Sequence, residues 1–292
     1  MVLPVPEQPT ISHMWLETLR QVHEAGGRVV NVISSTRHAT MEVPEIRGVV
    51  DRWLVPGARP DHTVYRVNTV ASTIFPAGRY RSPGLQWSQN LTDDEKALLD
   101  SRATALYERH IKSLPTLLQF DGNRHGTYFS RMVCWPGKYA GEVNQLRERV
   151  AALRALHDSP VSSTNVHDIV VGGEADWAEY GVRGLQVLQP TDRRLRGFPC
   201  LVHIDITVHD NELHMLAVYR HQYLITKGYG NLLGLGRLQQ FLCEQTGYAM
   251  GELAVQATLA DAEYGPWTKT NVRKIVAEAS AAAASVALVG AA

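Results

Sequence analysis

The chain has 292 residues and carries 29 Lys and Arg against 29 Asp and Glu, so its formal net charge is zero. A neutral chain lacks the positive field that promotes non-specific binding to nucleic acid or membranes, so we expect neither as a partner. Three cysteines without a CxxC pair favour a reducing compartment, and no apolar run is long enough to span a membrane, so we expect a cytoplasmic protein.

Helical and extended patterns alternate along the first quarter of the chain. Apolar residues at helical spacing predict a helix over 12–25, which Gly26-Gly27 would end. Short apolar runs predict strands over 28–33 and 49–54. The run over 64–75 is apolar enough for either a helix or a strand.

The next segments carry clearer boundary signals. Thr92 and Glu95 form a capping-box pattern that predicts a helix over 90–114, with Pro115 as its stop. Residues 120–137 are predicted to form a turn followed by a strand. The side chains of Tyr128, Ser130 and Met132 alternate there with those of Phe129, Arg131 and Val133. A second apolar stripe predicts a helix over 142–157.

The remaining elements follow in order to the C-terminus. We predict strands over 166–171 and 183–188, a hairpin of strands 201–208 and 213–220 around the turn 209–212, a helix over 232–246, and a helix from Asn271 into the Ala-rich tail. No linker or internal repeat divides the chain, and the strands come as hairpins. The sequence therefore predicts one α+β domain over 1–292.

The hairpin places two reactive groups near each other. If Val208 faces Leu213, then antiparallel pairing puts Cys200 opposite His221 and next to the partner of Arg220. A guanidinium near a thiol lowers its pKa and favours the nucleophilic thiolate. The alternative is that Cys200 is a small buried apolar residue and that Arg220 is a solvated strand end.

Several common motifs are absent. The glycine-rich run GYGNLLGLG has Leu233 where a dinucleotide fingerprint needs Gly, so it is a helix-entry turn or a close backbone approach. No GxSxG elbow of a serine hydrolase occurs. We expect no metal site, because four candidate ligands of the hairpin lack a tight spacing: His203, Asp205, His209 and His214.

The order and spacing of Pro199-Cys200, Arg220 and Asn231 resemble thymidylate synthase and its relatives, the pyrimidine nucleotide hydroxymethylases. The segment from Thr246-Gly247 to Leu253 is also similar to that family. Further matches are Tyr128 to Arg131, Asn144-Gln145-Leu146, and Arg37 in a possible phosphate-binding loop. The resemblance covers about the last half of the chain.

The resemblance implies a mixed or antiparallel sheet with flanking helices and a sheet-to-sheet homodimer. It implies that Cys200 adds to C6 of a pyrimidine nucleoside monophosphate and that C5 receives a one-carbon unit from 5,10-methylenetetrahydrofolate, a reduced folate. Asn231 would read the base, and its amide favours a uridylate-type base. The implied phosphate contacts are Arg220, Arg37 and, from the partner subunit, candidates among Arg183, Arg193 and Arg194.

The chain also departs from the family at its other contacts. No Glu occurs between Glu45 and Glu95, where the family carries a catalytic Glu. The family's sugar-binding His-x-Tyr is replaced by Asp261 and Glu263, which we take as candidate sugar contacts. The Ser and Asp that follow the family's Arg are replaced by two further candidates, His221 and Tyr223.

The leading hypothesis is a homodimeric methyltransferase or hydroxymethyltransferase that acts on C5 of a uridylate-type nucleotide. An alternative is a pyrimidine-nucleotide-binding protein without turnover, which the missing Glu favours. A third is a thiol hydrolase that uses Cys200 with His221, for which no oxyanion donors can be named.

Overall fold

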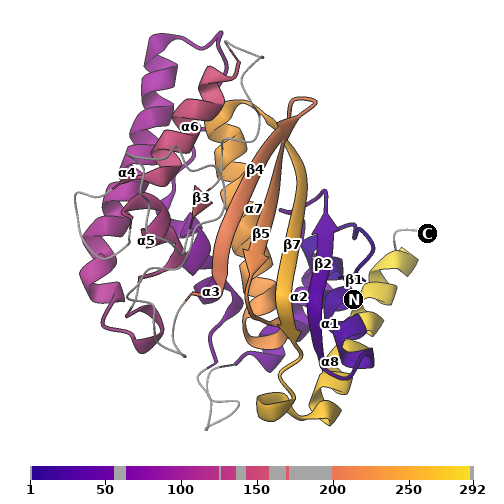
Figure 1. Cartoon of the computed structure of the whole chain (residues 1–292). Helices are drawn as coiled ribbons and strands as arrows, with labels where there is room; N and C mark the ends of the chain where they lie inside the picture. The colour runs from indigo at the N-terminus through magenta and orange to yellow at the C-terminus, as the bar shows by residue number, and fades with distance from the viewer. Residues whose placement is uncertain are drawn as a thin grey trace. The chain divides into compact units, whose positions relative to one another are not determined.

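The computed structural model describes residues 2–55, 64–124, 126–135, 143–157, 169–170 and 199–289. Its elements are helices and strands in mixed order, as Figure 1 shows. The helices are α1 Ile11–Glu24, α2 Pro44–Trp53, α3 Val67–Ile74, α4 Asp93–Leu117, α5 Tyr128–Val133, α6 Gln145–Ala155, α7 Tyr229–Thr246 and α8 Tyr264–Val289. The strands are β1 Leu3–Pro4, β2 Arg28–Thr36, β3 Ile169–Val170, β4 Leu201–His209, β5 Glu212–Tyr219, β6 Gln222–Tyr223 and β7 Ala249–Asp261.

The chain divides into two compact units, each assembled from separate stretches. Unit 1 comprises Met1–Ser72, Val218–Arg237 and Glu252–Ala292, and unit 2 comprises Thr73–Ala217 and Leu238–Gly251. Single elements, such as β5 and α7, therefore begin in one unit and end in the other. The expectation of one domain over the whole chain stays a prediction.

The strands form a mixed sheet in the order β1-β2-β7-β5-β4-β3, with β6 beside β7. Strand β1 runs parallel to β2, whereas β2 and β7 are antiparallel, with Arg28 opposite Asp261 and Thr36 opposite Leu253. The α+β class with flanking helices is thereby confirmed. Strand β7 was not predicted, although its alternately buried Leu253, Val255 and Ala257 carry a strand pattern.

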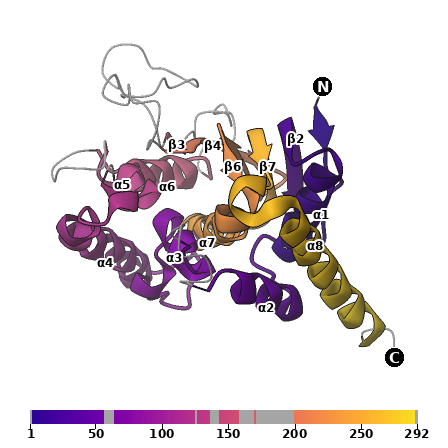
Figure 2. The same ribbon diagram turned by 90° about the horizontal axis from the view of Figure 1, so that it is seen from below.

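The helices of unit 1 pack on one another and on β2. Helix α1 lies against β2, and α8 lies alongside α1 and α2 (Figure 2). The predicted helix over 12–25 is confirmed as α1, whose buried side carries Trp15, Leu19 and Val22. Its first turn is capped by Thr10, whose hydroxyl accepts a hydrogen bond of 3.3 Å from the His13 N–H.

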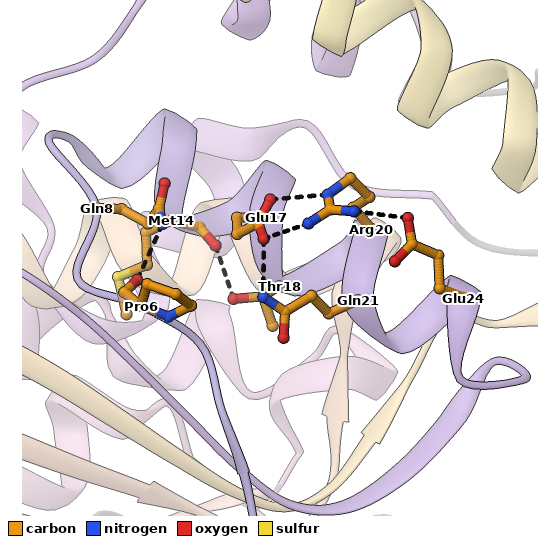
Figure 3. A network of polar contacts seen from close by, with 8 residues as sticks. All are labelled: Pro6, Gln8, Met14, Glu17, Thr18, Arg20, Gln21 and Glu24. Carbon is orange, nitrogen blue, oxygen red and sulfur yellow. Dashed lines mark hydrogen bonds and ion pairs between the residues drawn. The ribbon is translucent and has the colours of Figure 1, made fainter.

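The outer side of α1 carries a polar network (Figure 3). Arg20 donates hydrogen bonds to Glu17 at 2.8 and 2.6 Å and to Glu24 at 2.6 Å. The hydrogen bond from Arg20 is the main cause that lowers the pKa of Glu17. Exposed pairs at this spacing each contribute only about 0.3–0.5 kcal/mol, so the network mainly keeps this side of the helix solvated.

Two apolar segments in the first part of the chain are helices. The predicted strand over 49–54 is wrong, because Pro44 opens helix α2 and Ile46, Val49 and Val50 are buried at helical spacing. The segment 64–75, which had been open between helix and strand, contains helix α3.

Helix α4 of unit 2 confirms the predicted capping box. The Thr92 hydroxyl accepts from the Glu95 N–H at 3.3 Å, and the Glu95 carboxylate accepts from the Thr92 N–H at 2.9 Å. The predicted stop is wrong, since the helix passes Pro115 and ends at Leu117. A proline this close to the end interrupts only the last turn.

The predicted strand within 120–137 is also wrong, because Tyr128–Val133 is helix α5. The Thr127 hydroxyl caps it by accepting the Ser130 N–H at 3.0 Å. Phe129, Met132 and Val133 are all buried, so the two-residue alternation that suggested a strand has no counterpart in burial. The predicted helix over 142–157 is confirmed as α6.

The predicted hairpin is present as β4 and β5. Its turn contains two residues, Asp210 and Asn211, with φ of 49° and 62°, instead of the four expected. These positive φ values are those of the tight turns that match strand twist. The predicted register, with Val208 opposite Leu213, stays a prediction.

The glycine-rich run lies inside α7, which begins at Tyr229 and so starts earlier than predicted. A Cβ on Gly230 would come within 2.6 Å of Val70 Cβ, and one on Gly236 would overlap the Ala39 carbonyl oxygen. These glycines therefore allow close packing of the protein on itself.

Strand β3 confirms the centre of the predicted strand 166–171, whereas strand 183–188 lies outside the described residues. The C-terminal helix starts at Tyr264 instead of Asn271 and is broken at Thr268, whose φ is 59°. Within the described ranges, no helix is long and apolar enough to cross a membrane.

Candidate functional site

Cys200 lies directly before β4 in unit 2 and is half-buried. The other two cysteines, Cys134 and Cys243, are 1% and 5% exposed. No disulfide joins any of the three, and burial raises the pKa of Cys243 to about 12. Cys200 is therefore the cysteine best placed to react with a solute.

The backbone at Cys200 is held by Tyr128, the first residue of α5. The Tyr128 hydroxyl accepts hydrogen bonds from the N–H groups of Cys200 at 3.2 Å and Leu201 at 3.4 Å. Burial raises the pKa of Tyr128, and the neighbouring Cys200 raises it further. The phenol therefore stays protonated at neutral pH, and its proton remains available for donation beside the thiol.

A buried histidine supports the start of α5. The Thr127 hydroxyl that caps this helix lies 3.2 Å from Nε2 of His110, which is 1% exposed. Burial, and to a lesser degree the charge of Arg79, lowers the pKa of His110 to about 4. The imidazole is therefore neutral near pH 7, and His110 and Thr127 together fix the helix end from which Tyr128 reaches Cys200.

Four of the predicted nucleotide contacts come together in unit 1. Strand β6 pairs with β7 so that Tyr223 lies opposite Asp261. The His221 ring lies 4.2 Å from the Tyr223 ring, centroid to centroid, and His221 Nε2 is 3.4 Å from Asp261 Oδ2. Glu263 joins them because its backbone N–H donates to Asp261 Oδ1 at 2.6 Å.

Asp261 already has partners for both carboxylate oxygens. Its Oδ2 accepts a hydrogen bond of 2.9 Å from Nε of Arg28, and its Oδ1 accepts from the Glu263 N–H. The residue is 2% exposed. A buried carboxylate that is satisfied in this way is better suited to shaping a site than to binding a sugar.

Glu263 is also satisfied internally. Its Oε2 accepts from the N–H groups of Ile225 at 2.7 Å and Thr226 at 2.8 Å, and its Oε1 accepts from the Thr226 hydroxyl at 2.7 Å. Burial is the main cause that raises its pKa to about 7, and the charge of Asp261 contributes, while the Ile225 and Thr226 hydrogen bonds oppose the shift. Glu263 holds the chain at Leu224–Gly228, a π-helical segment that we call the π turn.

Asn231 lies just beyond the π turn, in the first turn of α7, and is 5% exposed. Its amide offers both a hydrogen-bond donor and an acceptor. At this position it could therefore make two hydrogen bonds with the edge of one planar ligand.

Arg37 lies away from this cluster. It follows the C-terminal end of β2, whereas Arg28 and Asp261 are paired at the other end. The rise of a strand places these two ends about 26 Å apart. Arg28, whose side chain is 72% exposed, is the arginine that the strand register brings to the carboxylates.

Other predicted residues are not brought together by described contacts. Arg183, Arg193 and Arg194 lie outside the described residues. Cys200 belongs to unit 2 and Arg220 to unit 1, so their predicted proximity stays a prediction. Among the described residues, no group of three or more His, Cys, Asp and Glu side chains could hold a metal ion.

The sequence analysis missed the contact of Tyr128 with Cys200 and that of Arg28 with Asp261. Both contacts join residues that are far apart in sequence, and no local pattern marks either one. Thr127 is a residue type typical of a helix N-cap, and it lies directly before Tyr128. This signal favours a helix that begins at Tyr128 in place of the predicted strand.

No protein-family model matches the chain, and no curated protein matches it. Function is therefore inferred from the chemistry and positions of the residues themselves.

Proposed function

We propose that this protein transfers a one-carbon unit to C5 of a pyrimidine nucleoside monophosphate through a covalent adduct between Cys200 and C6. The spacing of Cys200, Arg220 and Asn231 resembles that of thymidylate synthase, and the proposal includes that family's homodimer. The favoured base is uracil. The donor we propose is 5,10-methylenetetrahydrofolate, which supplies an electrophilic one-carbon unit when bound.

The observation that carries the proposal is the position of Asn231, which is 5% exposed and lies in the first turn of α7, just beyond the π turn. The resemblance places the base-reading residue at this position. An amide offers a donor and an acceptor, which match O4 and N3–H of uracil. Uracil could therefore make both hydrogen bonds with this one side chain.

The exposure of Cys200 supports the covalent step. A thiolate that adds to C6 of the pyrimidine forms a C–S bond and moves the C5–C6 π electrons onto C5 and the adjacent carbonyl. C5 would then attack the electrophilic carbon and lose its proton to solvent. The bond from that carbon to the folate nitrogen would break, and hydride from the reduced folate or a water molecule would complete a methyl or a hydroxymethyl group. The C–S bond would then break to return the thiolate. The Tyr128 hydroxyl, which accepts a hydrogen bond from the Cys200 N–H, is a proton donor next to this residue.

The sugar is not assigned to Asp261 or Glu263. The Asp261 oxygens accept from Arg28 and from the Glu263 N–H, and the Glu263 oxygens accept from Ile225 and Thr226. The His221 ring, whose side chain is 27% exposed, is the better candidate for a sugar hydroxyl.

Release of tritium from C5 of labelled UMP and dUMP, with and without the reduced folate, tests the proposal. Wild-type protein is expected to release tritium, and Cys200→Ser is expected to lose at least about a thousandfold of that rate because its hydroxyl is a much weaker nucleophile. Cys243→Ser is the matched control, since Cys243 is buried. Release that survives in Cys200→Ser would exclude the covalent mechanism.

A nucleotide-binding protein without turnover is the second candidate. Helix α3, Val67–Ile74, lies in the segment where the family carries its catalytic Glu, and its sequence VNTVASTI has no acidic residue. Calorimetry that shows UMP binding, together with no tritium release, would favour this candidate.

A further inference from the structure

The π turn Leu224–Gly228 connects two groups of candidate ligand contacts in unit 1. Arg220, His221 and Tyr223 come immediately before it, and Asn231 comes immediately after it. π-Helical segments are rare and are frequently found at functional sites. The position of this turn therefore sets where both groups of side chains lie.

The backbone of the π turn is held by two buried side chains. Glu263 accepts the N–H groups of Ile225 and Thr226, and Trp15 donates its indole N–H to the Leu224 carbonyl at 2.7 Å. The ring of Trp15 also fills the space beside Gly228, where a Cβ would lie 3.4 Å from the indole. Both polar sides of the turn therefore depend on side chains from outside it.

Glu263 itself adopts an unfavourable backbone conformation to make these contacts. Its φ is 59°, in the left-handed region that non-glycine residues rarely adopt. Its N–H is held by Asp261 at 2.6 Å and its carbonyl accepts from Trp267 at 2.9 Å. Such a backbone conformation persists only where the surrounding contacts stabilise it. The hydrogen bonds of Glu263 to the π turn are contacts of this kind.

We propose that Glu263 is a positioning residue, whose carboxylate fixes the π turn and so holds Asn231 and His221 in the arrangement that binds a nucleotide. The ligand part of this inference rests on the proposed function. Glu263 makes no direct contact with the sugar, which distinguishes this role from that of a ribose ligand.

The comparison of Glu263→Gln with Glu263→Ala separates the two roles. The glutamine oxygen can accept from both N–H groups, and its NH2 can donate to the Thr226 hydroxyl, so the turn is preserved. We expect Glu263→Gln to bind UMP within about twofold of wild type and Glu263→Ala to bind about tenfold or more weakly, as for the loss of hydrogen bonds to a charged acceptor. Equal weakening for UMP and dUMP is expected, because no 2′-hydroxyl is contacted.

Hydrogen exchange provides a readout that does not need the nucleotide. In Glu263→Ala, the amides of Ile225 and Thr226 should exchange about tenfold or more faster than in wild type, while Glu263→Gln should restore protection. Glu24→Gln is the matched control, because Glu24 is an exposed carboxylate of the same unit bound to Arg20.

The outcomes are distinguishable. Unchanged exchange at Ile225 and Thr226 in Glu263→Ala would overturn the positioning role, whatever the protein binds. Faster exchange in Glu263→Ala, together with no nucleotide binding by the wild-type protein, would contradict the proposed function. The support of the turn by Glu263 would then still be established. Loss of UMP affinity in Glu263→Gln with exchange unchanged would overturn the proposal in favour of direct sugar contact.

Discussion

The Tyr128 hydroxyl accepts a hydrogen bond of 3.2 Å from the backbone N–H of Cys200. This bond joins a helix start to the residue before a strand, and both belong to unit 2. It fixes the backbone of the proposed nucleophile without using the thiol. The position of the thiol can therefore be tested through the phenol.

Tyr128→Phe should slow C5 tritium release at least about tenfold and lower the free energy of unfolding by about 1–3 kcal/mol, because two backbone N–H groups lose their acceptor. Urea unfolding and the release assay check the two parts. Tyr248→Phe is the control, since its hydroxyl donates to the Leu153 carbonyl at 3.2 Å and has no bond to Cys200. Tritium release that is unchanged in Tyr128→Phe would show that this bond does not matter for chemistry.

Gly236→Ala should lower the free energy of unfolding by about 1–3 kcal/mol, the usual cost of overpacking, because its Cβ would overlap the Ala39 carbonyl oxygen. Gly48→Ala in α2 is the matched control. A Cβ there meets only the flexible end of Arg52 at 3.9 Å, so we expect it to stabilise by about 0.5–1 kcal/mol through helix propensity. Equal effects of the two changes on urea unfolding would contradict the close approach.

Sequence patterns of a few residues were sufficient to predict those helices whose ends and buried side are set by residues close in sequence. The capping box at Thr92 and the apolar stripe of α1 are contained in a few turns of chain, and both are confirmed. The wrong strand at 49–54 was predicted from a short apolar run, and the one within 120–137 from an alternation of side chains over 128–133. Such short patterns are compatible with a helix as well, and in α5 the burial of Phe129, Met132 and Val133 does not follow the alternation.

The candidate site depends on a longer-range property, the register of β2 on β7. No local signal indicates that Arg28 lies opposite Asp261 and that Arg37 lies at the far end of the strand. The roles of Asp261 and Glu263 likewise follow from hydrogen bonds to segments more than a strand away. The identities of these residues were readable from the sequence, but their partners were not.

The stability of the protein should fall as the pH is lowered from about 6.5 to about 4 because of His110. Its pKa is lowered to about 4 in the folded state by burial, so over this range the unfolded chain binds more protons. His110→Gln should reduce the slope by up to about 1.4 kcal/mol per pH unit. Urea unfolding of the wild type and of His110→Gln at several pH values measures this difference in slope. Both proteins have the same carboxylates, so the carboxylate contribution cancels, and identical slopes would contradict the lowered pKa of His110.

Glu263 should produce the opposite dependence. Its pKa is raised to about 7, so between about pH 4.5 and 7 the folded state binds more protons and stability falls as the pH rises. Glu263→Gln has no ionisable group and should remove this contribution. The difference in the free energy of unfolding between the two proteins, followed from pH 4.5 to 7.5, should therefore change in favour of the variant. A constant difference would show that the carboxylate is ionised throughout this range.

The phosphate contact can be located by comparing the two ends of β2. Arg28 is paired with Asp261 through Nε and its side chain is 72% exposed, whereas Arg37 lies beyond the other end of the strand. A charge-assisted hydrogen bond to phosphate is worth about 1.5–3 kcal/mol, so Arg28→Ala should weaken UMP binding about tenfold or more. Arg37→Ala should change the Kd less than about twofold.

Calorimetry with UMP and with uridine makes the comparison specific, because only a residue that contacts the phosphate affects the nucleotide more than the nucleoside. Arg28→Ala also releases Asp261 from its ion pair, and a general disturbance of the carboxylates would weaken both ligands alike. A loss in Arg37→Ala that is confined to UMP would place the phosphate at the loop after β2, as the family resemblance implies. That result would put the phosphate and the carboxylates at opposite ends of β2. His221 lies beside Asp261, so it would then be too far from the phosphate to contact the sugar.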